Sequence, residues 1–309
     1  MKKSLFKLLV CPVCHSSLIS KREYFFCRKC KKNYPLTNGI PNFSVTIDEP
    51  NMVLSQKKWD EKYINEYKPN IKKELDFLQN KFFDLSWNQI QHQYHLKKRG
   101  VFLEIGCGTF YLGRALAKKG YTVVGIDMSI HALEQAKRLF DKEKIKSYLL
   151  VCGNVLQMPF NKNSFNLLYG AGVIEHFKDT YPAIKELNRV LKIGGVSYNT
   201  VPYLNIGSLT YRQVWGNIPR LPLIEDLYTF IHTKLLEARH MRFGYELSFT
   251  RSYLEKMHRK ARFRSVKTGQ FLCELDFDYL PSKYLKRLAV YLAKNSFLFW
   301  PMIYVSAKK

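Results

Sequence analysis

At 309 residues, the chain is long enough to bury a full hydrophobic core, and we expect one large domain with appendages. No apolar run of about eighteen residues is uninterrupted, so a membrane-spanning helix is not expected. The apolar stretch at residues 8–10 is too short for a secretory signal. We therefore expect a cytoplasmic protein, with peripheral attachment to a membrane as the alternative.

The formal net charge of +25 is distributed unevenly along the chain. It amounts to +8 in residues 1–45, −1 in 46–94, +8 in 95–204 and +10 in 205–309. A charge of this size favours an RNA or an anionic membrane surface as partner. Lysine outnumbers arginine, and Phe, Tyr, Ile and Asn are abundant, which is also the bias of an AT-rich coding sequence. We give the two explanations equal weight.

Residues 1–45 contain two Cys-x-x-Cys pairs separated by twelve residues, formed by Cys11, Cys14, Cys27 and Cys30. Four thiolates on two tight turns are typical of a closed tetrahedral site for structural Zn²⁺. Disulfide bonds are the alternative, which a reducing compartment disfavours. We interpret His15, directly after Cys14, as a bystander because the four-thiolate set is already complete.

The same segment ends in Tyr34-Pro35 and Gly39-Ile40-Pro41, and it resembles small zinc-ribbon domains with a YPxxxGIP signature. Such ribbons are known as partners that activate methyltransferases and as N-terminal fusions to them. Basic side chains interleaved with the aromatic run at 24–26 could bind RNA. We favour packing, because a domain of about forty residues needs these rings for its own core.

Residues 46–94 are expected to form a linker followed by helices, because Phe, Leu, Trp and Ile recur there at helical spacing. Residues 101–129 then predict a buried strand, a glycine turn, a helix and a second strand ending in Asp127. A carboxylate at this position can accept hydrogen bonds from two ribose hydroxyls. The sequence therefore predicts a ligand that carries a ribose.

Two cofactor types compete for this turn. A dinucleotide fingerprint requires a glycine where Tyr111 stands, and Glu104 would repel a pyrophosphate but attract an ammonium group. With Gly106, Gly108 and Asp127, this pattern resembles the first motif of class I S-adenosylmethionine-dependent methyltransferases. Phe110 occupies the place of the third motif glycine.

The resemblance extends over residues 101–203. The segment at 153–177 is similar to the family's GDxxxLPFxxxxFDxV…EH pattern, with Asn154 and Asn166 in place of two aspartates. Asn154 can still offer a carbonyl oxygen to an adenine amino group. Residues 186–203 resemble the helix, Lys-x-Gly-Gly turn and fifth strand that follow in these enzymes. Within the class, the chain resembles the methyltransferase type 11 and ubiquinone-biosynthesis enzymes. Under this resemblance the cofactor contacts are Glu104, Gly106, Cys107, Gly108, Asp127, Met128, Asn154, Val155, Gly170 and Glu175.

The implied fold is α/β: a doubly wound, seven-stranded, Rossmann-like methyltransferase sheet with an antiparallel last strand and a small N-terminal zinc ribbon. We expect a zinc ribbon at 1–45, a linker and cofactor-covering helices at 46–94, and a methyltransferase domain at 95–309. Within it, residues 204–247 are the candidate substrate lid, residues up to 261 a helix capped by Thr250, and residues 263–272 and 302–307 the last two strands. The cofactor-covering helix would carry Trp59, Tyr63 and Tyr67. Aromatic residues at this helical spacing more commonly pack within a core, which is the alternative. The candidate lid contains Tyr211, Arg212, Trp215, Tyr228, His232, Arg239, His240, Arg242 and Tyr245.

Methyl transfer from a sulfonium needs placement more than a reactive side chain. His176 is the only histidine in a motif position, as a candidate base or orienting group, although we favour a structural role for the Glu175-His176 pair. The Glu-His form is typical of enzymes that act on small molecules, quinones, lipids and sugars. An RNA methyltransferase that uses the basic ribbon is the alternative acceptor class. An inactive methyltransferase-like scaffold, suggested by Phe110, Asn154 and Asn166, is the third hypothesis.

Overall fold

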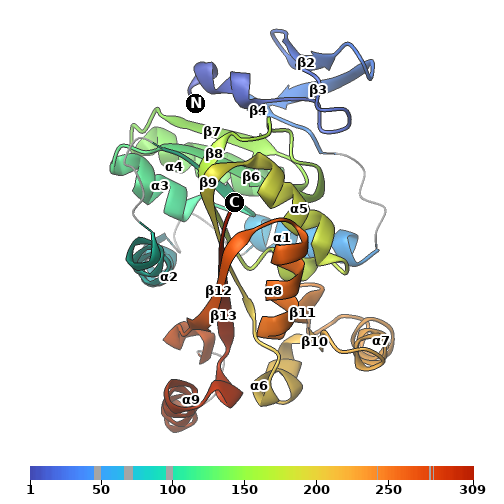
Figure 1. Ribbon diagram of the computed structural model, residues 1–309, viewed down its shortest axis with the longest axis vertical. Helices are drawn as coiled ribbons and strands as arrows, with labels where there is room; N and C mark the ends of the chain where they lie inside the picture. The colour runs from blue at the N-terminus through green and yellow to red at the C-terminus, as the bar shows by residue number, and fades with distance from the viewer. Residues whose placement is uncertain (45–49, 66–71, 95–99, 242, 278–279, 281) are drawn as a thin grey trace.

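The computed structural model describes residues 1–44, 50–65, 72–94, 100–241, 243–277, 280 and 282–309. A seven-stranded sheet forms its centre, with strand order β12-β13-β9-β8-β5-β6-β7 (Figure 1). β13 pairs antiparallel with both neighbours, and the pairs from β9 to β7 are parallel. The expected α/β fold with an antiparallel last strand is confirmed. The strands are β5 (Val101–Ile105), β6 (Thr122–Asp127), β7 (Tyr148–Cys152), β8 (Phe165–Ala171), β9 (Leu191–Pro202), β12 (Arg264–Phe271) and β13 (Met302–Lys308).

Helices cover both faces of this sheet, so its central strands are apolar along nearly their whole length. One hydrophobic core contains side chains of α2, α3 and α4, and the other contains side chains of α5, α8 and the N-terminal ribbon. β5 and β7 have the bounds that their apolar runs predict. The helices are α1 (Pro50–Asn65), α2 (Lys72–Gln93), α3 (Tyr111–Lys118), α4 (Ile130–Lys142), α5 (Thr180–Val190), α8 (Arg251–Lys260) and α9 (Lys283–Asn295).

Helix starts follow the capping residues of the sequence. The Oγ1 atom of Thr250 accepts a hydrogen bond from the amide of Tyr253 at 3.2 Å, as the capping prediction for α8 requires. Ser129 caps α4 in the same way, through the amide of Ala132 at 3.3 Å. The Ser129 cap fixes the backbone just after β6, where Asp127 ends the strand.

The N-terminal ribbon is a four-stranded sheet in the order β1-β2-β3-β4, preceded by a 3₁₀ turn, η1 (Lys3–Leu8). It lies against β7 at one end of the molecule (Figure 1). The amide of Phe43 donates to the carbonyl of Cys152 at 2.7 Å, and the amide of Val10 donates to the carbonyl of Pro159 at 3.0 Å. Ribbon and central sheet thus share backbone hydrogen bonds and one core. The ribbon strands are β1 (Ile19–Ser20), β2 (Tyr24–Cys27), β3 (Lys32–Thr37) and β4 (Ile40–Pro41).

Residues 204–247 form a layer at the opposite end of the molecule, around a two-stranded parallel sheet of β10 and β11 (Figure 1). Its elements are α6 (Ile206–Leu209), η5 (Tyr211–Trp215), β10 (Asn217–Pro219), α7 (Ile224–Phe230), the π-helical turn η6 (Ile231–Leu235) and β11 (Glu246–Ser248). Further 3₁₀ turns are η3 (Val155–Gln157), η4 (Ile174–His176), η7 (Glu274–Phe277) and η8 (Phe297–Phe299). Within the described ranges, no helix is both long enough and apolar enough to cross a bilayer.

Candidate functional site

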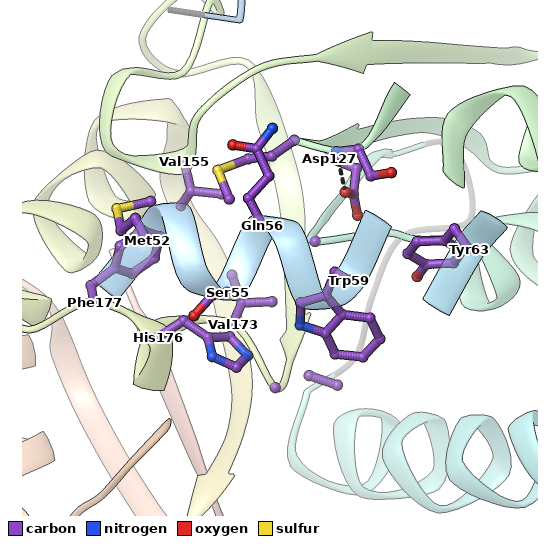
Figure 2. A pocket seen from close by; sticks show the side chains of 15 residues that line it. Met52, Ser55, Gln56, Trp59, Tyr63, Asp127, Val155, Val173, His176 and Phe177 are labelled. Atoms are coloured by element: carbon purple, nitrogen blue, oxygen red, sulfur yellow. Dashed lines mark hydrogen bonds between the residues drawn. The ribbon is translucent and has the colours of Figure 1, made fainter. Parts of the chain in front are cut away.

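A cavity of about 120 Å³ lies at the carboxyl edge of the sheet, where the strand order turns from β5 toward β6 on one side and β8 on the other. This is the topological switch point at which open α/β sheets bind ligands. Its walls come from the turns after these strands and from α1, which crosses the opening (Figure 2). The strand-end walls are Gly106, residues 127–129, Val155 and residues 171–173, followed by His176 and Phe177.

Asp127 stands at the end of β6 with both carboxylate oxygens engaged. One oxygen accepts a hydrogen bond from the amide of Gly108 at 2.8 Å, and the other accepts one from the amide of Ser129 at 2.9 Å. Burial raises the pKa of Asp127 to about 6, and these amide donors partly oppose the rise. The carboxylate therefore joins the glycine turn to the start of α4 and remains part of the cavity wall.

Glu104 lies in β5 behind the glycine turn and outside the set of cavity-lining residues. Its Oε2 atom accepts a hydrogen bond from the amide of Gly113 in the first turn of α3 at 2.9 Å. Burial raises the pKa of Glu104 to about 8, and the nearby Asp127 adds to this rise. Glu104 thus anchors α3 to the turn and carries a proton at neutral pH in the absence of a cation.

The α1 wall presents side chains at helical spacing, Met52, Gln56, Trp59 and Tyr63, which Figure 2 shows along the face of α1 at the pocket. Tyr63 sits directly on Gly108, where its hydroxyl occupies the place that a Cβ atom would take. Gly108 also has φ = +50°, so its missing side chain serves both the turn and this contact. Trp59 and Tyr63 thus line the cavity, their role in covering a cofactor stays a prediction, and Tyr67 lies outside the described residues.

Three contacts hold α1 over the cavity. The hydroxyl of Ser129 donates to Asp60 at 2.5 Å, and the side-chain amide of Gln135 donates to the carbonyl of Tyr63 at 2.7 Å. On the other side, the amide of Tyr245 donates to the hydroxyl of Ser55 at 3.0 Å. α1 therefore connects α4 to the end of the 204–247 segment.

His176 follows β8 and lines the cavity beside Phe177. Its Nδ1 atom lies 2.6 Å from the carbonyl oxygen of Tyr245. Because a carbonyl oxygen only accepts, Nδ1 carries the proton and Nε2 of the neutral ring keeps a lone pair. This is the tautomer that a proton acceptor needs.

Glu175, the neighbour of His176, faces away from the cavity wall into a buried polar cluster. Burial raises the pKa of Glu175 well above its usual range, and the charge of Glu246 adds to the rise. Arg212 forms a buried ion pair with Glu246 at 2.8 Å and donates to the carbonyl of Pro301 at 2.9 Å. This cluster ties η4, β11 and the start of β13 together beneath the site.

The remaining predicted cofactor residues surround the cavity without lining it. Cys107 is buried against Gly125, Gly170 packs against Ile105, and the side-chain oxygen of Asn154 accepts from the amide of Leu156 at 2.9 Å. Among the predicted cofactor contacts, Gly106, Asp127, Met128 and Val155 line the cavity. The predicted catalytic candidate His176 also lines it. Asn166 lies at the opposite end of β8, where its side-chain oxygen accepts from the amide of Val101 at 3.0 Å. The asparagine that replaces the family's aspartate here is therefore remote from the cavity.

The candidate lid at 204–247 contributes no side chain to the cavity wall among its described residues. Its contacts lie behind the cavity wall: the Tyr245 carbonyl oxygen accepts from His176, and the Phe243 ring packs at a tilt against Trp59, with 5.7 Å between ring centroids. Arg242 lies outside the described residues. The role of 204–247 as a substrate lid stays a prediction, and the cavity wall opposite the strand ends comes from α1.

Sequence reasoning missed Met52, Ser55 and Gln56 on α1, and Val173 and Phe177 after β8. The spacing of residues 52, 56, 59 and 63 was the available signal, because it places all four on one helix face. Val173 lies on Gly106, where a Cβ atom would approach its Cγ2 to 2.6 Å. The glycine at 106 therefore makes room for Val173 as well as for a ligand.

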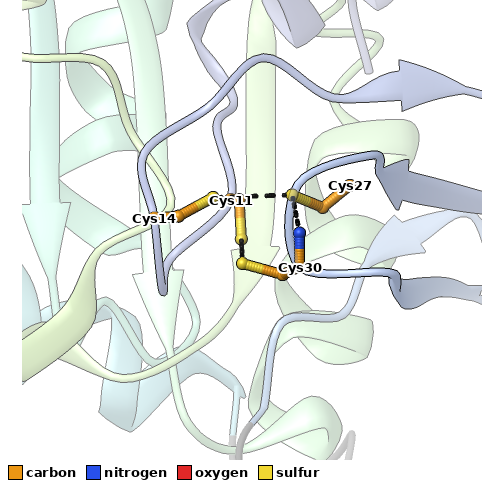
Figure 3. A group of neighbouring side chains, drawn as sticks. All are labelled: Cys11, Cys14, Cys27 and Cys30. Carbon is orange, nitrogen blue, oxygen red and sulfur yellow. Dashed lines mark hydrogen bonds between the residues drawn. The ribbon is translucent and has the colours of Figure 1, made fainter.

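The four ribbon cysteines converge as predicted (Figure 3), with their Sγ atoms all within 4.8 Å of one another. The sulfur-sulfur separations are 3.8 Å for Cys11 and Cys30 and 3.5 Å for Cys14 and Cys27. Tetrahedral Zn–S bonds of about 2.3 Å require sulfur atoms about 3.8 Å apart. All seven cysteines are free, so the arrangement fits a metal and not disulfides.

Within the aromatic run at 24–26, Phe25 is buried as the packing interpretation predicts, whereas Phe26 is partly buried and Tyr24 is exposed. Phe25 and Tyr34 are buried, with ring centroids 6.1 Å and 4.9 Å from that of Phe43. The Tyr34 hydroxyl also lies 3.2 Å from the Sγ atom of Cys11. These rings join the cysteine cluster to the shared core.

Comparison with known proteins identifies the central part of the chain. Residues 103–198 match the family model described as a methyltransferase domain. The sterol 24-C-methyltransferase of Aspergillus fumigatus is 34% identical over 109 residues, covering 35% of this chain and 29% of that protein. The demethylmenaquinone methyltransferase of Staphylococcus aureus is 30% identical over 153 residues, covering 46% of this chain and 61% of that protein. The chain thus spans less than two thirds of either relative.

Two solved structures share the fold. A complex of the Haloferax volcanii Trm112 methyltransferase activator with a methyltransferase has a TM-score of 0.54 at 12% identity, covering 85% of this chain and 99% of that one. Phosphoethanolamine N-methyltransferase 2 of Haemonchus contortus with S-adenosyl-L-methionine has a TM-score of 0.52 at 18% identity, covering 90% of this chain and 62% of that one. Residues 103–198 thus match a methyltransferase domain, and the chain shares its fold and its strand order with these solved structures.

Proposed function

We propose that the protein transfers a methyl group from S-adenosylmethionine to a small apolar or amphipathic acceptor of the quinone or lipid class. The observation that carries the proposal is the composition of the cavity wall: Asp127 stands on one side, and Met52, Trp59, Val173 and Phe177 supply apolar surface. Such a site combines one polar anchor with apolar contact area. The related sterol and demethylmenaquinone methyltransferases favour this acceptor class over RNA.

Asp127 and the glycine turn would hold the cofactor. The Asp127 carboxylate can accept from ribose hydroxyls, and the unhindered backbone at Gly106 lines the cavity beside it. Glu104, buried next to the turn, would supply negative charge toward the amino group of the methionine moiety. The bound cofactor supplies an electrophilic methyl group, and the protein supplies placement and exclusion of water.

His176 would act on the acceptor. Its Nδ1–H is held by the Tyr245 carbonyl, so Nε2 is available to accept a proton from an acceptor hydroxyl as the methyl group is transferred. Because Tyr245 also binds Ser55 of α1, closure of α1 and orientation of the imidazole depend on the same residue.

The ribbon site would hold a structural Zn²⁺ through Cys11, Cys14, Cys27 and Cys30. Four thiolates leave no open position for a substrate, so the metal would stabilise the ribbon and its contact with β7.

Isothermal titration calorimetry with S-adenosylhomocysteine tests the cofactor assignment. The native protein should bind, and Asp127→Ala should weaken binding at least tenfold, whereas the matched Asp84→Ala on the exposed side of α2 should not. Absence of binding by the native protein would favour an inactive scaffold. Methyl transfer to a demethylated quinone and to bulk RNA should then be compared with radiolabelled cofactor, and transfer to RNA alone would refute the proposed acceptor class.

A further inference from the structure

The end of the molecule opposite the ribbon exposes apolar side chains on two helices. On α9, Tyr284, Leu288 and Tyr291 are 68%, 53% and 64% exposed. Their spacing of four and three residues places them on one helix face, while Ala293 on the opposite side is fully buried. The face of α9 that contains Ala293 therefore packs against the rest of the protein, and the face with the larger apolar side chains is exposed to solvent.

The second helix repeats this pattern. Leu223, Leu227 and Phe230, at the start and along α7, have the same spacing and are 90%, 55% and 53% exposed. Between the two helices, α6 contacts both η8 and β10, and β10 contacts α7. Figure 1 shows α9, α6 and α7 along the same end. We call this end the apolar end; its exposed apolar side chains include Ile206, Leu209, Leu223, Leu227, Phe230, Tyr284, Leu285, Leu288, Tyr291, Phe297 and Leu298.

The charged residues within α9 and η8 are all basic. The stretch from α9 through η8, residues 283–299, contains Lys283, Lys286, Arg287 and Lys294 and no acidic residue. Lys294 forms one exposed ion pair, with Glu274 of η7 at 3.3 Å. A helix with leucine and tyrosine on one face and lysine and arginine beside them is typical of helices that lie in a membrane interface.

A groove of about 360 Å³ adjoins the same surface. Arg251 and Lys294 line it, together with the aromatic residues Tyr203, Phe297 and Trp300. Two cations with aromatic rings beside an apolar surface suit a phosphate-bearing headgroup whose acyl chains continue along Phe297. The groove lies near the carboxyl end of β9, on the same edge of the sheet as the active-site cavity.

We propose that the apolar end is a docking surface for an anionic lipid bilayer. Two copies of the chain that face each other through α9 would bring the cations of residues 283–294 in one copy against the same cations in the other. A nucleic acid would use the cations but leaves the exposed leucines without a role. An anionic bilayer complements both, and it would present apolar acceptors at the catalytic edge of the sheet. The docking itself does not depend on the proposed methyl transfer.

The experiment is co-sedimentation of the full chain with vesicles of phosphatidylcholine alone and of equal parts phosphatidylcholine and phosphatidylglycerol. The native protein should bind the anionic vesicles, and the combined variant Leu227→Glu/Leu288→Glu should bind at least tenfold more weakly. Ile193→Glu is the matched control, because Ile193 is 86% exposed near the amino-terminal end of β9 and away from this surface. Equal loss of binding by Ile193→Glu would overturn the proposal.

A second pair of variants tests the charges. Lys283→Gln/Arg287→Gln should weaken binding to anionic vesicles and reduce its salt dependence, and Lys142→Gln on the exposed end of α4 should change neither. Sedimentation equilibrium without lipid provides the remaining test. A dimer that Leu227→Glu/Leu288→Glu dissociates would show that a second copy covers this face and would overturn the proposal. Binding of S-adenosylhomocysteine, measured on every variant, reports separately on the active site.

Discussion

The ring of Phe110 lies on Gly113, so close that a Cβ atom on Gly113 would overlap it. Phe110 occupies the motif position where the resembled family has a glycine, and its backbone is left-handed, with φ = +56°, a conformation that glycine adopts more readily. Its ring is fully buried, 5.4 Å from the ring of Phe140, and turns away from the cavity. Gly125 makes further room, since a Cβ atom there would lie 3.0 Å from the ring. The large side chain of Phe110 is thus accommodated within the hydrophobic core by Gly113 and Gly125.

This relationship predicts the effect of filling the space at Gly113. Gly113→Ala should lower the free energy of unfolding by about 2 kcal/mol or more, because the added methyl group displaces the Phe110 ring. In a Phe110→Gly background the same substitution should be neutral or stabilising, since alanine favours a helix over glycine by about 1 kcal/mol. Urea unfolding of the four proteins in this cycle measures the coupling. Equal effects in both backgrounds would contradict the contact.

The raised pKa of Glu104 predicts a stability that depends on pH. The folded chain holds a proton with a pKa of about 8, whereas an unfolded glutamate releases it at about 4.3. Between these values the folded state binds more protons, so this group makes the ligand-free protein less stable as pH rises. Glu104→Gln should therefore stabilise the ligand-free protein at pH 8 by about 1–3 kcal/mol, because the neutral side chain can still accept from the Gly113 amide.

The same substitution should weaken binding of S-adenosylmethionine, whose positive charge the ionised carboxylate attracts. Thermal unfolding from pH 5 to pH 8, with and without cofactor, separates the two effects. Glu61→Gln, on the exposed side of α1, is the control and should alter neither. A Glu104→Gln variant that loses stability at every pH would refute the assigned protonation state.

His176→Gln should reduce methyl transfer by about 10²–10⁴-fold if the imidazole accepts a proton. Binding of S-adenosylhomocysteine should stay within about twofold of the native value, since Asp127 and the glycine turn are unchanged. His131→Gln, exposed on α4, is the matched histidine control. Unchanged single-turnover transfer by His176→Gln would leave this residue with a structural role only.

Loss of the proposed zinc should destabilise the central domain as well as the ribbon, because Phe25, Tyr34 and Phe43 belong to the same core as the sheet. Cys14→Ser should lose bound zinc and lower the Tm by about 5 °C or more. His15→Asn should retain both metal and Tm, since His15 stands outside the sulfur cluster. Metal analysis with scanning calorimetry checks both variants, and a Cys14→Ser protein with native zinc content would refute the site.

The sequence predicts β5 and β7 well because residues 101–105 and 148–152 are short, mostly apolar runs, each followed directly by a glycine. The cysteine cluster is equally predictable, since ligand spacing constrains its geometry. The part of the cavity wall formed by α1 is less predictable from the sequence, because only tertiary packing decides which face of an amphipathic helix lines the cavity. The long segment at 204–247 could be recognised as an insertion, but nothing in its residues indicates that Tyr245 would hold His176 from behind.

The attachment of the ribbon to β7 has a consequence for stoichiometry. Here the hydrogen bonds from Phe43 and Val10 to the β7 side of the sheet are formed within one chain. A covalent link converts such docking into an intramolecular event whose effective concentration does not change on dilution. Each methyltransferase domain is therefore synthesised together with the ribbon that packs against β7, in a fixed ratio of one to one.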